Sequence, residues 1–337
     1  MTAAPPLSVL LPVRDGAAHL DEAIESIEGQ SFTEFEVLAV DDGSVDDTYE
    51  KLEAWASRDA RVTVIQQARE GIVAALEAGR AAASGRYLAR MDSDDVSQRT
   101  RFARQYELME ARSDLVLCGC RVEYFPREQV RGGALWYEAW INSTSTPDEV
   151  AREIFVECPI AHPTFFMRAE AVAAVGGYQD RGWAEDYDLL FRLWNAGGGL
   201  GVVPETLLSW REGESRLSRT DPTYAPDAFR RCKVHYLLEA FPEVVEGALI
   251  WGAGPVGKAL AKELVKRGVE LFGFAEVDPR KIGQRIHDVP VLDTAQALAE
   301  RGVLHLGAVG QKGARQQLRS LLREGGLEEL KSFVVMA

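Results

Sequence analysis

The sequence lacks any run of about 18 apolar residues, the length that a membrane-spanning helix needs, so we expect no membrane span. The apolar run at residues 7–13 is broken by Pro12 and has no basic segment before it. It therefore predicts a first strand and not a signal peptide. These features predict a cytoplasmic protein. An aromatic segment at residues 135–141 leaves open peripheral contact with the inner face of a membrane. The favoured interpretation is a helix that is buried or lines a binding site.

Cysteine is also scarce, with four residues at positions 118, 120, 158 and 232. The pair Cys118 and Cys120 has no matching second pair, so the spacing argues against a zinc site. We expect reduced thiols.

Positive charge is lacking in the first part of the chain. Residues 1–246 hold 25 Lys and Arg against 42 Asp and Glu, whereas residues 247–337 hold 13 against 10. Because nucleic acids are bound through positive surfaces, this balance argues against a nucleic-acid partner. The acidic charge balance is compatible with a nucleotide that is bound through a metal ion.

An acidic turn, Asp92-Ser93-Asp94-Asp95, follows a short apolar strand at residues 86–91. Carboxylates this close repel one another unless a cation or hydrogen-bond donors offset the charge. Mg²⁺ and Mn²⁺ favour such oxygen ligands and leave room for diphosphate oxygens. The turn alone fits a solvated loop or a helix cap equally well.

Strand-like and helical segments alternate along the first part of the chain, which predicts an α/β fold with a mainly parallel sheet. The acidic turn and a second acidic pair, Asp41-Asp42, both follow predicted strands, where ligands bind in open parallel sheets. The segment from 98 to about 173 is less regular, and residues 209–226 read as an irregular loop. The predicted strands are 8–12, 35–40, 62–66 and 87–91, and the predicted helices include 19–28, 48–56, 72–83, 101–111, 187–195 and 228–239.

Several short motifs occur in a specific order in residues 7 to about 220. They are Ser8–Asp15, Val40–Ser44, Ala89–Asp95, His162–Thr164 and Glu185–Leu189. Together they resemble the family 2 glycosyltransferases, inverting enzymes of the GT-A fold that use nucleotide-sugar donors. The resemblance implies a GT-A nucleotide-diphospho-sugar transferase fold, with a mixed, mainly parallel sheet between helices. We expect this domain to span residues 1–246.

The resemblance also implies roles for single residues. Asp94 would bind Mn²⁺ or Mg²⁺ between the donor phosphates, with Asp95 in support, and Asp186 would be the catalytic base. Glu185 would orient the acceptor or Asp186, and Arg90 lies close enough to approach a phosphate. The donor-nucleotide residues would be Pro12, Val13, Asp15, Asp42, which reads the base, and Asp92, which contacts the ribose.

Simpler explanations exist for each residue taken alone. Asp42 fits a turn before a helix, Glu185 and Asp186 fit favourable charges at a helix N-terminus, and His162 fits a packed histidine. Three arginines, at 211, 216 and 219, lie where the family often has a mobile loop over the donor, or are solvated charges. The combination of motifs favours the transferase.

The predicted activity is transfer of one sugar from a nucleotide-sugar, with UDP favoured and dTDP also compatible. The acceptor would be a glycan or a lipid-linked molecule, in cell-surface glycan synthesis. Leu76-Glu77-Ala78-Gly79 departs from the family's usual Leu-Asn-x-Gly, and the Gln-x-x-Arg-Trp motif of processive synthases is absent. Two other hypotheses stay open: an inactive nucleotide-sugar sensing or scaffold protein, and a bifunctional protein with an NAD-linked C-terminal domain.

The C-terminal segment, 247–337, contains Gly252-x-Gly254-x-x-Gly257 between a predicted strand and helix, followed by Glu276. This context favours a nucleotide-binding turn. The segment resembles the small Rossmann-like domains fused to some sugar-modifying enzymes, which implies a bound nucleotide or NAD. Its length is about half that of a full dinucleotide fold, and it shows no residue for hydride transfer, so a binding or docking role is favoured.

Overall fold

The computed structural model describes residues 4–213, 216–286, 288–311 and 313–337. The chain forms two compact units. The first comprises Met1–Val150 and Pro159–Asp221, and the second comprises Ala151–Cys158 and Pro222–Ala337. Helix α10 (Pro226–Ala240) thus groups with the C-terminal segment. The sequence predicts a domain boundary between residues 246 and 247. Compact units of this kind do not test which part of the chain folds on its own, so that boundary stays a prediction.

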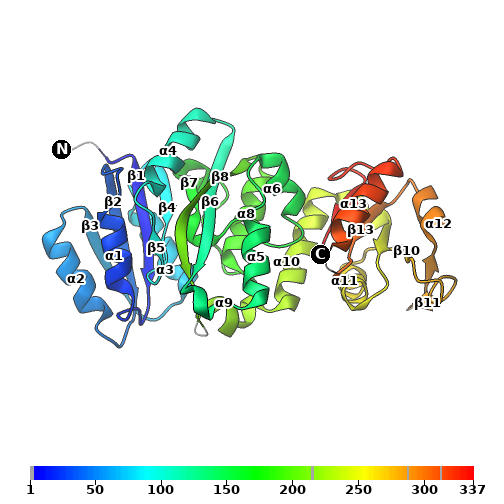
Figure 1. Ribbon diagram of the computed structural model, residues 1–337, viewed down its shortest axis with the longest axis horizontal. Helices are drawn as coiled ribbons and strands as arrows, with labels where there is room; N and C mark the ends of the chain where they lie inside the picture. Colours follow the sequence, from blue (N-terminus) through cyan, green and yellow to red (C-terminus); the bar gives the residue numbers. More distant parts are fainter. Residues whose placement is uncertain (1–3, 214–215, 287, 312) are drawn as a thin grey trace. The chain divides into compact units, whose positions relative to one another are not determined.

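The first unit contains an eight-stranded mixed sheet in the order β3-β2-β1-β4-β7-β6-β8-β5 (Figure 1). Four neighbouring strands, β3, β2, β1 and β4, pair in parallel, and β6 pairs in parallel with β8. β7 runs antiparallel to both of its neighbours, and β5 runs antiparallel to β8. The bounds are β1 Leu7–Val13, β2 Phe35–Asp42, β3 Val62–Gln67, β4 Tyr87–Arg90, β5 Val96–Ser97, β6 Leu115–Phe125, β7 Phe166–Arg168 and β8 Gly199–Arg211.

The helices of this unit bury their apolar faces against the sheet. In α1 the residues Leu20, Ala23, Ile24 and Ile27 recur at helical spacing, and all four are buried. In α3, Ala75, Leu76 and Gly79 are buried, and Gly79 faces Leu10 and Val40 of the sheet. The bounds are α1 Leu20–Glu28, α2 Thr48–Arg58, α3 Ile72–Ala82, α4 Arg101–Ala111, α5 Gly132–Ile141, α7 Ala169–Ala174, α8 Glu185–Asn195 and α9 Leu217–Thr220, with a 3₁₀ turn η2 at His162–Thr164. Helix α6 (Pro147–Glu153) spans the division between the units.

Two segments differ from expectation. The long strand β6 lies in the region whose pattern was least regular. Its first half, up to Cys120, is buried almost continuously, and burial alternates only from Arg121 on. Residues 209–226 are not wholly irregular, since β8 continues to Arg211 and α9 follows. The aromatic segment is helical, as predicted: Tyr137 and Trp140 pack on the core, whereas Trp136 is 47% exposed.

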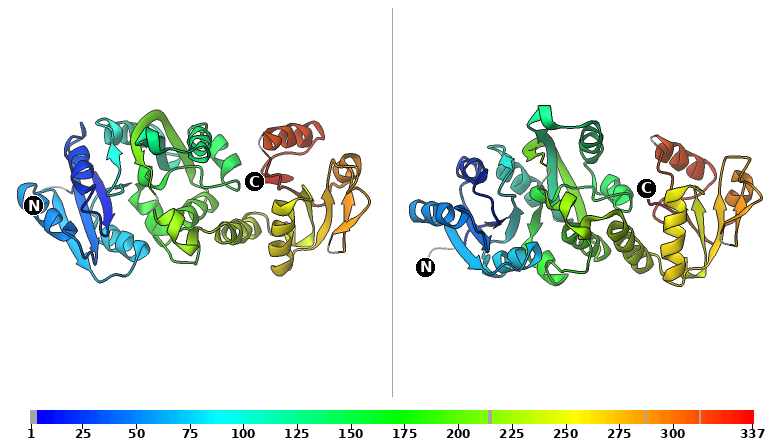
Figure 2. Two further views of the ribbon diagram at one scale, coloured as in Figure 1. Left: turned by 60° about the horizontal axis from the view of Figure 1, so that its bottom comes forward. Right: turned by 90° about the horizontal axis from the view of Figure 1, so that it is seen from below.

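The second unit contains a six-stranded sheet in the order β11-β12-β10-β9-β13-β14. All neighbouring pairs are parallel except β11 with β12. Figure 2 shows its helices in yellow at α11 and red at α13. The bounds are β9 Ala248–Trp251, α11 Pro255–Lys266, β10 Leu271–Ala275, β11 Arg285–Ile286, β12 Val289–Leu292, α12 Thr294–Ala299, β13 Leu304–Gly307, α13 Ala314–Glu324 and β14 Phe333–Val335. Within the described residues, no helix is long and apolar enough to cross a membrane.

Candidate active site

Three carboxylates gather directly after β4. One ligand oxygen from each of Asp92, Asp94 and Asp95 lies within 4.8 Å of the others. Asp95 is buried, and the other two are partly exposed. Because β1, β2 and β4 run parallel, the turn lies at the same sheet edge as the ends of β1 and β2, the edge at which such sheets bind ligands.

Arg211, at the end of β8, holds the acidic turn in place. Its backbone N–H donates to Asp95 Oδ1 at 2.7 Å, and its Nε donates to the Asp94 carbonyl at 2.6 Å. Its guanidinium also pairs with Glu22 at 2.8 Å and lies 4.3 Å from the ring centre of Phe125. The shape of the turn therefore depends on a strand far away in the sequence.

Burial and a neighbouring negative charge raise the pKa of two of these carboxylates, Asp94 and Asp95. Burial, and then the charge of Asp92, raise the pKa of Asp94, and the same causes raise the pKa of Asp95 well above its ordinary value. The charge of Arg216 acts in the opposite direction on both. Oδ2 of Asp95 is buried and has no hydrogen-bond partner among the described residues. A close set of repelling carboxylates with an unsatisfied oxygen fits a hard divalent cation such as Mg²⁺ or Mn²⁺.

Arg216 is one of the three arginines that the resemblance places where the family often has a mobile loop over the donor. Its guanidinium lies 4.3 Å from the ring centre of Trp210 and 3.6 Å from the Glu212 carboxylate. Burial lowers its pKa, but the neighbouring groups, Asp95 and Asp92 among them, outweigh this effect and raise it. A fixed positive charge thus faces the acidic turn.

The loops that follow β1 and β2 are tied together. Asp15, which has a left-handed backbone (φ 48°), accepts from Val45 N at 2.9 Å and donates its own N–H to Ser44 Oγ at 2.9 Å. Pro12 and Val13 are buried at the end of β1, in register with residues 40 and 41 of β2. The predicted donor residues of β1 therefore lie beside the end of β2.

Asp42 is buried and strongly hydrogen-bonded. Its Oδ1 accepts from Gln67 Nε2 and Glu70 N, each at 2.8 Å, and its Oδ2 accepts from Gly71 N at 3.0 Å. The loop between β3 and α3 thereby fixes the carboxylate at the sheet edge. Because a carboxylate oxygen has two acceptor positions, Oδ2 can still accept one further N–H.

Asp186 lies in the first turn of α8 and is partly exposed. Its Oδ1 accepts from Tyr187 N at 2.7 Å. The preceding Glu185 is buried, and its Oε1 lies 3.6 Å from His162 Nδ1. The other ring nitrogen of His162 lies 3.1 Å from the Tyr178 hydroxyl. The start of α8 is therefore attached to η2 and to the turn before the helix.

A buried cation connects this helix start with the acidic turn. Arg90, 3% exposed, forms an ion pair with Asp92. Burial lowers the pKa of Arg90, but the charges of Asp92 and, more weakly, Glu185 outweigh it, so the net pKa is raised. Burial, and then the charge of Arg90, keep the pKa of His162 well below its ordinary value. The structure thus brings Asp92, Arg90 and Glu185 into one charged cluster.

The glycine-rich turn of the second unit lies between β9 and α11. Gly252 has φ 112°, and a Cβ on Gly257 would lie 1.9 Å from the Gly252 carbonyl oxygen. Glu276 accepts from Ala253 N at 3.3 Å and pairs with Lys281 at 2.8 Å. Its carboxylate therefore closes on the glycine-rich turn.

The fold of the first unit is that of the GT-A class of glycosyltransferases. The family model for glycosyl transferase family 2 matches residues 8–176, half of the chain. The chain belongs to this family and is a glycosyltransferase. Among curated proteins it is similar to AmsE of Erwinia amylovora, an amylovoran biosynthesis glycosyltransferase: 27% identity over 218 residues covers 63% of this chain and 78% of AmsE.

Solved structures share the fold. A fragment, residues 1–349, of S. aureus TarS in complex with UDP-GlcNAc matches with a TM-score of 0.57 and 17% identity, over 77% of this chain and 71% of that one. The mannosyltransferase PcManGT of Pyrobaculum calidifontis, in complex with GDP-Man and Mn²⁺, matches with a TM-score of 0.51 and 16% identity, over 97% and 82%. These likenesses confirm the GT-A fold predicted from the sequence.

Proposed function

We propose that the first unit transfers one sugar from a nucleotide-sugar, with UDP as the favoured nucleotide, to an acceptor hydroxyl with inversion of configuration. The observation that carries this proposal is the cluster of Asp92, Asp94 and Asp95, faced by Arg216, at the sheet edge that also holds Asp42. This edge has the charges that a diphosphate and its cation require. The name of AmsE, an amylovoran biosynthesis glycosyltransferase, supports a role in glycan synthesis. We propose that the acceptor is a glycan or a lipid-linked molecule in cell-surface glycan synthesis.

In this mechanism Asp186 accepts the proton of the acceptor hydroxyl while that oxygen attacks the anomeric carbon. The new carbon–oxygen bond forms as the bond between the anomeric carbon and the phosphate oxygen breaks, and the electron pair leaves with the nucleoside diphosphate. Attack from the opposite face inverts the anomeric centre. A divalent ion held by Asp94, with Asp92 and Asp95, would offset the negative charge of the departing diphosphate.

The remaining residues bind and orient. Asp42 would accept the imide N–H of the base through Oδ2, and the loop at Pro12, Val13 and Asp15 would enclose the nucleotide. Glu185, whose Oε1 lies 3.6 Å from His162 Nδ1, would orient Asp186 or the acceptor. The partial exposure of Asp186, next to the buried Glu185, supports the assignment of Asp186 as the residue that meets the acceptor.

The test is release of UDP from a panel of UDP-sugars with Mn²⁺, comparing the wild type with Asp94→Ala and Asp186→Asn. Loss of a general base or of a metal ligand is expected to lower the rate by about 10²–10⁴-fold. Glu170→Gln, an exposed acid on α7, is the matched control. A wild-type rate in Asp186→Asn would remove that residue from the mechanism. If UDP-sugars bind and no turnover occurs with any acceptor tested, the sensing or scaffold hypothesis is favoured.

We further propose that residues 247–337 form a Rossmann-like accessory domain that binds a nucleotide. The parallel strands of its sheet support this proposal, since the glycine-rich turn at Gly252, Gly254 and Gly257 follows one of them, β9. Glu276, which accepts a hydrogen bond from this turn, supports it as well. The NAD-linked hypothesis is tested by titrating the full chain with NADH and following its fluorescence. An increase that persists in Asp94→Ala would support it, and an unchanged signal would exclude it.

A further inference from the structure

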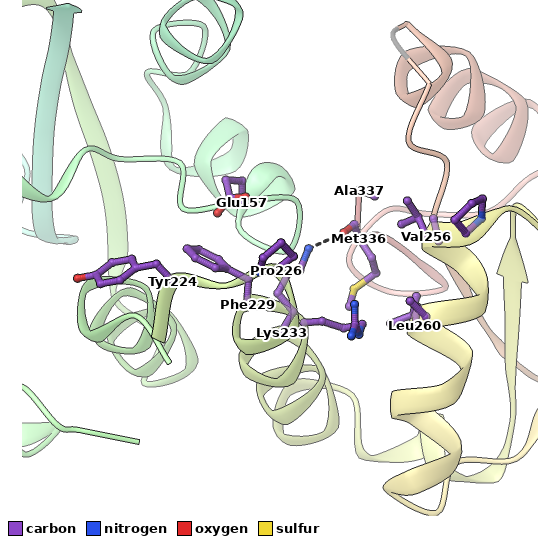
Figure 3. Close-up of a pocket in the computed structure, with 13 residues that line it drawn as sticks. Glu157, Tyr224, Pro226, Phe229, Lys233, Val256, Leu260, Met336 and Ala337 are labelled. Atoms are coloured by element: carbon purple, nitrogen blue, oxygen red, sulfur yellow. Dashed lines mark hydrogen bonds between the residues drawn. The ribbon is translucent and has the colours of Figure 1, made fainter. Parts of the chain in front are cut away.

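The second unit contains a pocket of about 480 Å³ that the glycine motif does not predict. Its walls come from α10, from the first turns of α11 and from the end of the chain after β14. Figure 3 shows Tyr224 and Phe229 at one end and Val256 and Leu260 at the other. This volume lies within the range, about 300–1,000 Å³, of pockets that bind small molecules.

Two cations line the pocket. Lys233 Nζ donates to the carbonyls of Val156 at 3.1 Å and Met336 at 2.8 Å. An ammonium group has three N–H donors, so one is left without a partner among the described residues. Arg230 pairs with Asp227, yet its Nε is buried and has no hydrogen-bond partner within the described part of the chain. Because buried donors without partners are costly, these groups favour an occupant rich in acceptor oxygens.

An acid and two aromatic rings line the same pocket. The Glu157 side chain accepts from Cys158 N at 3.3 Å, which leaves acceptor positions for a ligand. The rings of Tyr224 and Phe229 have centroids 6.5 Å apart and are tilted by 49°. The site therefore offers an apolar, aromatic end with an adjacent acceptor, in addition to the donors of Lys233 and Arg230.

The pocket also reaches the N-terminus of α11, through Pro255 and Val256. The first N–H groups of a helix have no partner within the helix and favour negative charge. This helix end adds N–H donors to those of Lys233 and Arg230, in a pocket that Glu157 also lines.

We infer that this pocket binds a nucleoside monophosphate, with the phosphate between Arg230, Lys233 and the first turn of α11, and the base against Phe229. A base or ribose supplies the N–H or O–H donors that Glu157 accepts, and aromatic side chains commonly stack on bases. This inference rests on the proposed nucleotide-binding role of the second unit and not on the transfer reaction of the first. It also places part of the site on α10, outside residues 247–337, through Phe229, Arg230 and Lys233.

The test is isothermal titration of the full chain carrying Asp42→Ala and Asp94→Ala, which weaken the donor site. UMP and AMP are titrated separately, with inorganic phosphate as a third ligand. We expect a nucleoside monophosphate to bind with a stoichiometry near one. We also expect Arg230→Gln to weaken binding by about tenfold or more, because it removes a charge-assisted contact. Leu260→Trp should fill the pocket and abolish binding.

Arg231→Gln, a change on the same helix at a residue that does not line the pocket, is the matched control and should bind normally. Thermal unfolding of each variant shows whether it folds. If Leu260→Trp does not fold, Arg230→Gln still tests the pocket. Binding that is unchanged in Arg230→Gln, or the absence of binding by either nucleotide, overturns the inference. Inorganic phosphate that binds as tightly as the nucleotides overturns it as well. UDP-sugar turnover by the chain with an unaltered donor site is measured in parallel, so failure of this pocket is distinguishable from failure of the proposed transferase.

Discussion

Arg211 and Asp95 are joined by a hydrogen bond of 2.7 Å from the Arg211 backbone N–H to Asp95 Oδ1, although 116 positions separate them in the sequence. The Arg211 side chain makes a second bond to the same turn, from Nε to the Asp94 carbonyl. The acidic turn is thus shaped from the opposite part of the sheet, because β8 pairs with β5 directly after the turn.

Arg211→Ala should therefore loosen the acidic turn while leaving the backbone bond intact. Loss of the charge-assisted bond and of the pair with Glu22 is expected to lower the free energy of unfolding by about 1–3 kcal/mol. Less rigid ligands should weaken Mn²⁺ binding by about 10–100-fold. Urea denaturation and Mn²⁺ titration measure the two effects. Arg14→Ala, which removes a weak 4.0 Å pair with Asp15, is the control, and unchanged Mn²⁺ affinity in Arg211→Ala would contradict the argument.

Arg216→Gln should reduce catalysis more than it reduces stability. The Arg216 charge faces the acidic turn, so we expect it to stabilise the diphosphate as the sugar leaves. The predicted loss in kcat/KM is about 10–100-fold, and Arg216→Lys should recover part of it because the charge is kept. Arg219→Gln is the matched control, since Arg219 pairs with the same Glu212 but is half exposed. If Arg216→Gln and Arg219→Gln lower kcat/KM equally, the loss comes from the ion pairs with Glu212 and not from the charge of Arg216 at the acidic turn.

Gly257→Ala should destabilise the second unit, whereas Gly254→Ala should not. A Cβ at Gly257 would lie 1.9 Å from the Gly252 carbonyl oxygen, so the turn must open to admit it. At Gly254 the backbone is extended and no heavy atom lies within 4 Å of the added carbon. We expect a loss of about 3 kcal/mol or more in the first variant, measured by urea denaturation. Similar stabilities for the two variants would contradict the close approach.

Sequence reasoning located the carboxylates because they follow strands whose apolar pattern is easily recognised, as at Asp42 and Asp92. It gave the first four strands and helix α4 nearly to the residue. It named Arg211 and Arg216 as candidates for a loop over the donor, but it did not predict their contacts. These contacts depend on how β8 lies in the sheet, and the β6–β8 pairing contains register shifts that local pattern does not encode. The sequence pattern of α10 likewise does not say with which unit the helix groups, because an amphipathic pattern predicts a helix but not the surface that covers it.

The buried His305 makes the stability of the second unit depend on pH. Trp251 Nε1–H donates to His305 Nδ1 at 2.9 Å, and His305 Nε2 lies 2.8 Å from the Glu300 carbonyl. The neutral ring with its proton on Nε2 satisfies both contacts, whereas a proton on Nδ1 would face the indole N–H. Burial lowers the pKa of His305 below 6.5, in agreement with this geometry.

Since the unfolded chain binds this proton more tightly than the folded one, the stability is fully present above pH 6.5. It declines as the pH falls from 6.5 toward the lower pKa of the folded state, by up to about 1.4 kcal/mol per pH unit. Urea denaturation between pH 7.5 and 5 should show this decline in the wild type and a smaller one in His305→Gln, whose side chain does not titrate. Equal slopes in the wild type and His305→Gln would show that the His305 ring accepts its second proton without cost, and that the Trp251 bond does not hold it neutral.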